Sequence, residues 1–150
     1  MASVLDAVKL QSPFPGLFVF IAESKSSRFT MTATKPTPVK PSVPIDVLNE
    51  IDIRVGTIDF VEEVKGSDKL VKLIVNFGDH KRSILAGMRK ERQNPKEVEG
   101  KQGLFMVNLE PKRMFGELSE GMLFDIGYAD GITPVLAVPE RPVPNGTRAG

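Results

Sequence analysis

The stretch that decides the fold is IDIRVGTIDFVEEVKGSDKLVKLIVNFGDHKRSILAG, residues 51–87. Apolar and polar residues alternate toward a strand over 51–64, and 70–77 is a β-branched run long enough for a second strand. Glycine-containing turns separate these segments from each other and from a third strand over 81–87. Gly56 marks a place where a bulge or a sharp coil is expected inside the first strand. The stretch therefore predicts three consecutive antiparallel strands.

Downstream of this stretch, residues 88–100 interrupt the strand pattern. Asn94 followed by Pro95 is typical of a helix N-cap and first turn, and Gly100 ends the segment. Further strands are expected over 101–109, 121–128 and 133–139. An SH3-like barrel or a small sandwich would share this number of strands. The helical break between the third and fourth strands favours an all-β, five-stranded Greek-key OB-fold barrel with a C-terminal extension.

The first 44 residues have a different composition from the rest. Four prolines within nine residues (36, 38, 41 and 44) deny the backbone the hydrogen bonds of helices and sheets and favour an extended linker. The apolar run PGLFVFIA (15–22) lacks the basic flank and the cleavage site of a signal peptide. We therefore expect a disordered leader and proline-rich linker over 1–44, followed by one OB-fold domain over 45–150.

Composition excludes several classes of protein. The 150 residues include 20 Lys+Arg and 19 Asp+Glu, and 15 of the basic and 17 of the acidic residues fall within 45–150. A nucleic acid would have to bind this domain through a local patch, because the global field is not positive. No Cys is present, which fits a reducing compartment, so we expect a cytoplasmic protein. No apolar run approaches the roughly 20 residues of a membrane-spanning helix, so we expect no membrane insertion.

Catalytic and metal-binding arrangements are not apparent in the sequence. His80 is the single histidine and falls in a predicted turn without a second metal ligand or a catalytic partner nearby. Glu62 and Glu63 are neighbours on a strand and point to opposite faces. No glycine-rich phosphate-binding loop is present. We therefore expect neither an enzyme, nor a cofactor, nor a metal site.

Two segments could bind a phosphate backbone. The connection NLEPKRMFGELSEGM (108–122) combines cations, an amide, a hydroxyl, a phenyl ring and two thioethers. By composition alone it is equally well a surface loop whose methionines fill the barrel. The run 81–96 is rich in Lys and Arg, and such a run is more often a solvated face than a nucleic-acid footprint. It supplies a secondary basic patch of Lys81, Arg82, Arg89 and Lys90.

Taken together, four motifs resemble the free-standing tRNA-binding domain family. They are IDIRVGTI (51–58), SDKL (67–70), the 108–122 connection and PERPVPNG (139–146). The family includes the C-terminal domain of bacterial methionyl-tRNA synthetase, the EMAP-type domain and the CsaA-type secretion chaperones. SDKL and SEGM are similar to the synthetase-related branch, whereas the RPVPNG ending is similar to the CsaA-type branch. The resemblance implies an OB fold over about 105 residues.

The resemblance also implies a binding site on the 108–122 connection. The family's tRNA contacts fall on Asn108, Arg113, Ser119 and Met122, with Met114 packed beside them. Glu110 stands where family members often have Lys, and Phe115 stands where many have Arg. Lys112 restores one cation, and Phe115 offers stacking in place of an ion pair. The site residues expected from the sequence are Asn108, Lys112, Arg113, Met114, Phe115, Ser119 and Met122.

Two functions from different classes follow from the resemblance. The first is structure-selective tRNA binding without catalysis, in support of an aminoacyl-tRNA synthetase. The alternative is a CsaA-like chaperone that holds unfolded precursor proteins in an apolar groove. A homodimer is expected in either case, because similar family members pair through the segment before the first strand and the C-terminal extension. In this chain these are Ile45, Val47 and Leu48, with the region 133–148.

Overall fold

The computed structural model describes residues 35–150, so the leader expected over 1–34 lies outside the described residues. Residues 35–44 of the expected linker form neither helix nor strand and are exposed. The short helix α1 (Ile45–Asn49) follows them and buries none of its residues. Regular β structure begins only after this helix.

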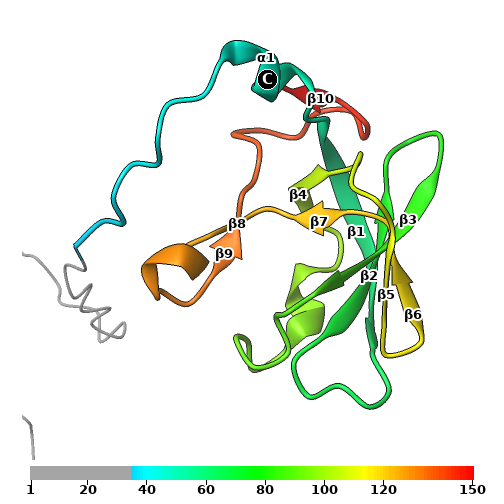
Figure 1. Ribbon diagram of the computed structural model, residues 1–150. Helices are drawn as coiled ribbons and strands as arrows, with labels where there is room; N and C mark the ends of the chain where they lie inside the picture. Colours follow the sequence, from blue (N-terminus) through cyan, green and yellow to red (C-terminus); the bar gives the residue numbers. More distant parts are fainter. Residues whose placement is uncertain (1–34) are drawn as a thin grey trace, which may run out of the picture. The chain divides into compact units, whose positions relative to one another are not determined.

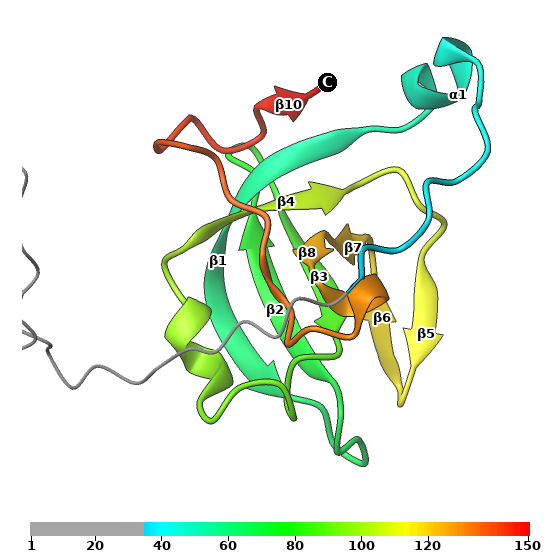
Figure 2. The same cartoon turned by 90° about the vertical axis from the view of Figure 1, so that its left-hand side faces the viewer.

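Five antiparallel strands form the OB-fold barrel, which confirms the expected fold class (Figure 1). They are β1 (Ile53–Glu63), β2 (Val71–Asn76), β3 (Lys81–Ala86), β4 (Gln102–Met106) and β7 (Met122–Leu123). Their order is β3-β2-β1-β4-β7, because the long β1 pairs with β2 on one side and with β4 on the other. Figure 2 shows how the bend of β1 curls this sheet. A sixth strand, β10 (Arg148–Ala149), pairs with the start of β1.

The expected helix between the third and fourth strands is one turn of 3-10 helix, η1 (Pro95–Val98). Asn94 is its N-cap, and the side-chain oxygen of Asn94 accepts a hydrogen bond from the backbone N–H of Lys96 at 3.1 Å. Val98 is fully buried against the core. The Asn-Pro signal in the sequence thus marks a real helix start, although the helix is short.

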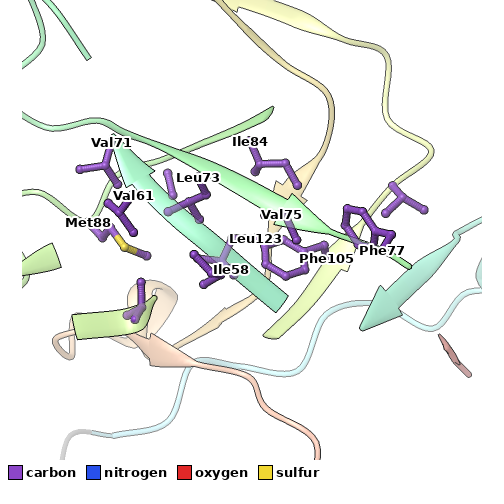
Figure 3. Packing of buried hydrophobic residues seen from close by; sticks show 13 residues of the cluster. Ile58, Val61, Val71, Leu73, Val75, Phe77, Ile84, Met88, Phe105 and Leu123 are labelled. Atoms are coloured by element: carbon purple, nitrogen blue, oxygen red, sulfur yellow. The ribbon is translucent and has the colours of Figure 1, made fainter. Parts of the chain in front are cut away.

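The core lies inside the curled sheet and consists of side chains from its strands together with Phe77, Met88, Val98 and Val107 from the connections (Figure 3). Phe77 and Phe105 meet edge to face with ring centroids 5.7 Å apart. Gly56 permits this packing, because a Cβ at this position would lie 2.5 Å from Cγ1 of Val75. The expected bulge is not at Gly56: the register of β1 and β2 shifts between Ile58 and Phe60.

Two small ribbons leave the main sheet. One is formed by β5 (Lys112–Met114) and β6 (Glu117–Ser119), and the other by β8 (Asp125–Ile126) and β9 (Val135–Leu136), with the 3-10 turn η2 (Tyr128–Asp130) between β8 and β9. The prediction of one continuous strand over 121–128 is wrong. The chain changes partner at Phe124, because β7 pairs with β4 whereas β8 pairs with β9.

The C-terminal extension is fastened to the barrel by the PNG sequence at 144–146. The side-chain oxygen of Asn145 accepts hydrogen bonds from Thr57 Oγ1 at 2.8 Å and from Gln102 Nε2 at 3.0 Å. Gly146 has φ of +85°, and a Cβ there would collide with the carbonyl oxygen of Phe77. The motif therefore has a structural role that its sequence alone does not reveal.

The open edge of β3 is covered by side chains instead of another strand. The backbone N–H of Leu85 donates to Ser119 Oγ at 3.0 Å, and that of Ser83 donates to a carboxylate oxygen of Glu120 at 3.1 Å. The N–H of Glu120 in turn donates to the carbonyl of Ser83 at 2.8 Å. This arrangement satisfies an edge that would otherwise be free to pair.

Candidate nucleic-acid interface

The 108–122 connection forms the β5–β6 hairpin. Met114 and Glu117 are its last cross-strand pair, so Phe115 and Gly116 are the two central residues of the turn. Their φ values are +51° and +79°. Two positive φ values in a two-residue loop are typical of a type I′ turn, whose twist matches that of the flanking strands. The turn therefore presents the phenyl ring of Phe115 at the tip of a regular hairpin.

The hairpin lies along the outer side of the barrel and reaches the β1–β2 turn. Glu117 on β6 forms an ion pair with Lys72 of β2 at 3.2 Å, and Lys72 also pairs with Glu62 of β1 at 2.8 Å. The hydrogen bond with Glu62 contributes most to raising the pKa of Lys72. At the tip, Cδ1 of Phe115 would lie 3.8 Å from a Cβ built on Gly66 of the β1–β2 turn. In OB folds the loops between strands 1 and 2 and between strands 4 and 5 commonly bind ligands.

Two of the expected site residues form hydrogen bonds with other parts of the same chain. The side-chain oxygen of Asn108 accepts a hydrogen bond from the N–H of Asp52 at 2.8 Å, and its nitrogen donates to the carbonyl of Glu50 at 2.6 Å. Ser119 is only 5% exposed, and its hydroxyl also donates to the carbonyl of Gly121 at 3.1 Å. Both side chains therefore hold the connection in place, and their role toward a ligand stays a prediction.

Three expected site residues are exposed at the hairpin. Lys112 and Arg113 lie on opposite faces of β5 and have no ion-pair partner among residues 35–150. Phe115 is 60% exposed. Met114 is half-buried and faces the same side as Lys112. The hairpin thus combines two free cations with an exposed aromatic ring.

Two further residues, which the sequence reasoning did not single out, belong to the same region. Lys65 on the β1–β2 turn precedes Gly66 and is exposed without an ion-pair partner in the described part of the chain. Phe60 is 58% exposed on β1, opposite Ile74 of β2. Strict alternation from the buried Ile58 would point Phe60 inward, and the bulge turns it outward. We call Lys65, Lys112, Arg113 and Phe115 the loop-tip patch.

The secondary basic patch is divided between the two ends of β3, and each of its cations has a partner. Lys81 pairs with Asp59 at 2.8 Å, and Lys90 pairs with Asp68 at 2.5 Å. Arg82 donates to the carbonyls of Val107 and Glu120, and Arg89 donates to the carbonyl of Ser67 and pairs with Glu63 at 3.5 Å. These neighbours reduce the positive potential that the four side chains would otherwise offer a phosphate.

The remaining expected site residue, Met122, lines a separate groove of about 610 Å³, which we call the C-terminal groove. Its apolar lining includes Leu85, Met88, Met122, Leu123, Val135 and Leu136, and its rim includes Lys69, Lys90, Glu91, Arg92, Asp125 and Tyr128. Burial, followed by the nearby charge of Asp125, raises the pKa of Glu91. The groove is thus an apolar trough with a charged rim.

The ring of His80 contacts three neighbouring side chains. Its ring stacks on Phe77 with centroids 5.6 Å apart, and its Nε2 accepts a hydrogen bond from Arg82 at 3.1 Å. Its Nδ1 therefore carries the proton and donates to Asp79 at 2.6 Å, which lowers the pKa of that carboxyl. Residues 35–150 hold no cluster of His, Asp and Glu side chains suited to a metal ion. No helix in the same range is long and apolar enough to cross a membrane.

The curled five-stranded sheet and its two adjoining loops define an OB-fold binding domain. Residues 53–148 match the family model described as "Putative tRNA binding domain", and the chain belongs to this family.

The relatives comprise whole synthetases and small free-standing proteins. The chain is 43% identical over 107 residues to a methionine–tRNA ligase of Methanothrix thermoacetophila, covering 71% of this chain but 15% of the ligase. Its fold matches the MetRS-related protein of Pyrococcus horikoshii with a TM-score of 0.68 and 33% identity, covering 74% of this chain and 100% of that one. The chaperone CsaA of Bacillus anthracis gives a TM-score of 0.60 and 27% identity, covering 73% and 100%.

Proposed function

We propose that this chain binds tRNA through the loop-tip patch, without catalysing a reaction. The observation that carries the proposal is that two OB-fold loops approach each other at Gly66 and Phe115, and that they carry an exposed aromatic ring and three cations without ion-pair partners among residues 35–150. Cations that lack a carboxylate partner interact with phosphates without first giving up an ion pair. The relatives support the choice of ligand, because methionine–tRNA ligases contain a similar domain.

The size of the site sets the expected salt dependence. Three phosphate contacts from Lys65, Lys112 and Arg113 give a slope of log affinity against log salt of about −2 to −3. Removal of one cation lowers the magnitude of this slope by roughly one contact. Most of the affinity at low salt is therefore expected to come from these side chains.

The experiment is a titration of total tRNA at several salt concentrations with the full chain and two alanine variants. Arg113→Ala should weaken binding and reduce the slope. Lys101→Ala removes the same charge from an exposed position outside the two loops and should leave both unchanged. Equal effects of the two substitutions would show that binding follows net charge, and the proposed site would be wrong.

We further propose that the bound tRNA is presented to an aminoacyl-tRNA synthetase. In the methionine–tRNA ligases a similar domain is part of the same polypeptide as the rest of the enzyme. A separate chain that associates with a synthetase would raise the local concentration of tRNA in the same way. Addition of this protein should then lower the KM of methionyl-tRNA synthetase for tRNA without changing kcat.

A second candidate function is the capture of unfolded protein in the C-terminal groove. The apolar lining of this groove supports it, as does the structural similarity to the chaperone CsaA. Capture of an apolar segment should depend little on salt, whereas phosphate binding weakens steeply as salt rises. Val135→Asp puts a charge into the groove, away from the loop-tip patch, and should abolish binding of a permanently unfolded protein while leaving tRNA binding intact.

A further inference from the structure

The loop-tip patch contains one residue in a backbone conformation that its side chain disfavours. Phe115 has φ of +51° and is the one non-glycine residue with a positive φ between residues 35 and 150. A bulky side chain is rare in the left-handed region, and Asn or Gly is the usual residue at this place in a type I′ turn. An observed outlier of this kind points to a functional use of the geometry that it creates.

The geometry leaves a face of the ring available to a ligand. Cδ1 of Phe115 lies 3.8 Å from the place that a Cβ on Gly66 would occupy, so the ring lies next to the β1–β2 turn. The side chain is nevertheless 60% exposed, so it does not serve as core. A Phe side chain has only two side-chain torsions, so little conformational entropy is lost when a flat ligand stacks on its ring.

The charges around the ring separate places for phosphates from places for bases. Lys65 and Arg113 lie within two residues of the two turns, and Lys112 lies one residue farther down β5; none of the three has a carboxylate partner among residues 35–150. The acidic side chains of Glu62 and Glu117 flank Lys72, and Glu117 directly follows the Phe115-Gly116 turn. The Glu62–Lys72–Glu117 cluster has one more carboxylate than cations, so it attracts phosphates less than the three cations without carboxylate partners do.

A second exposed aromatic ring lies near this acidic cluster. Phe60 and Glu62 are two residues apart on β1, so they point to the same outer face. Two exposed aromatic rings, Phe115 and Phe60, are therefore available for stacking on this side of the described chain.

We infer that this site takes an unpaired base of an RNA loop and stacks it on Phe115, while the neighbouring cations hold the phosphates on either side. The inference rests on the proposed function and specifies the part of the RNA that is recognised. A continuous duplex does not fit this role, because its bases already stack on one another and its edges lie in the grooves. The expected ligand is a loop or bulge whose bases are free to leave their stack.

The test compares three labelled RNAs by fluorescence anisotropy: a stem-loop, the same stem-loop with abasic loop residues, and a blunt duplex of equal length. Wild type should bind the stem-loop roughly tenfold more tightly than either other RNA. A tenfold difference lies near the lower end of the affinity gain expected from stacking one base on an aromatic side chain. F115L keeps an apolar side chain without a π face and should lose this preference without changing the salt slope. F115R should instead steepen the slope by about one contact.

Tyr128→Leu is the matched control, since Tyr128 is an aromatic residue that is 74% exposed but lies on the rim of the C-terminal groove. This variant should bind all three RNAs like wild type. The abasic RNA tests stacking without altering the protein, so the result does not depend on the folding of F115L.

The outcomes separate this inference from the proposed function. Stacking is wrong if F115L binds the stem-loop as tightly as wild type does, and wild type binds the abasic RNA as tightly as the stem-loop. If Arg113→Ala still weakens binding in that case, the proposed phosphate binding stands. If wild type binds neither tRNA nor any of the three RNAs, both are wrong. An effect of Tyr128→Leu equal to that of F115L would place the base in the C-terminal groove and overturn the inference.

Discussion

At the scale of single residues, Phe115 carries a conformational cost that another side chain would avoid. Asn adopts the left-handed region more readily than a bulky residue, so Phe115→Asn should raise the free energy of unfolding by about 1 kcal/mol and the Tm by about 4 °C. Phe115→Ala keeps the unfavourable φ and should show no such gain. Thermal unfolding of the three proteins measures this difference, and a Tm for Phe115→Asn at or below that of wild type would contradict it.

Ser119 offers a second prediction at this scale. Ser119→Ala removes the acceptor of the buried Leu85 N–H, and an unpaired buried donor costs about 1–3 kcal/mol. Ser83 is the matched control, because its hydroxyl is buried without a partner among the described residues. Ser83→Ala should therefore be neutral or slightly stabilising. Urea unfolding of both variants distinguishes a specific hydrogen bond from a general effect of losing a hydroxyl.

Which site residues sequence reasoning could identify depends on how far away their partners lie. Lys112, Arg113 and Phe115 are on a connection without nearby acids except Glu110 and Glu117, so their exposure could be anticipated. Asn108 contacts Glu50 and Asp52, which are more than fifty residues away in the chain. Such a contact depends on the register of the whole sheet, and no local pattern indicates it.

At the scale of elements, the order of strands was predictable and some boundaries were not. The β-branched run of β2 and the Asn-Pro start of η1 are local signals, and both were found where expected. The β5–β6 hairpin has neither alternating β-branched residues nor an Asn-Gly turn, so its strands could not be recognised. Because Phe115 stands where Asn is usual, the sequence lacks the usual turn signal. The same residue gives the hairpin its exposed ring.

The junction between β1 and β10 should make stability depend on pH. Hydrogen bonds from Arg54, with a smaller contribution from Arg148, lower the pKa of Asp52 below its ordinary value of 3.8. A carboxyl whose pKa is lower in the folded state contributes stability at neutral pH, and this contribution is lost as the pH falls through the folded-state value. Stability of wild type should therefore decline between about pH 5 and pH 2 more steeply than that of Asp52→Asn.

Asp68 provides the comparison for this measurement. The hydrogen bond with Lys90, at 2.5 Å, also lowers the pKa of Asp68, but the carboxyl is 74% exposed, so solvent screens the interaction and it adds little to stability. Asp68→Asn should leave the pH dependence of urea unfolding close to that of wild type. If Asp52→Asn shows the same acid-induced decline as wild type, the β1–β10 ion pairs do not contribute as we expect.

At the scale of the whole molecule, α1 is the segment that we expect to contact a second copy of the chain. This helix of five residues buries none of its side chains and has no side-chain cap, and Ile45 is 68% exposed. A helix so short is not stable in water without tertiary contacts. We expect two copies of the chain to bury these segments against each other, together with the region 133–148.

Sedimentation equilibrium at micromolar concentration measures the mass directly. Wild type should give the mass of two chains, and the double substitution Ile45→Asp with Leu48→Asp should give the mass of one. A single-chain mass for wild type would overturn the expected homodimer. The control is Phe60→Asp, which puts one of these two charges on an exposed apolar position of the barrel and should leave the dimer intact.

The hydrogen bonds that residues 119–120 make to the edge of β3 affect how readily the protein aggregates. A hydroxyl, a carboxylate and the backbone N–H of Glu120 complete this edge, so a local opening of residues 119–120 uncovers backbone donors and acceptors without unfolding the barrel. The uncovered strand carries Ile84 and Leu85 and has the hydrophobic, β-prone character that recruits strands from other molecules. Loss of the Ser119 and Glu120 side chains would therefore allow β3 to pair with strands of other molecules and start aggregation, while most of the native structure persists.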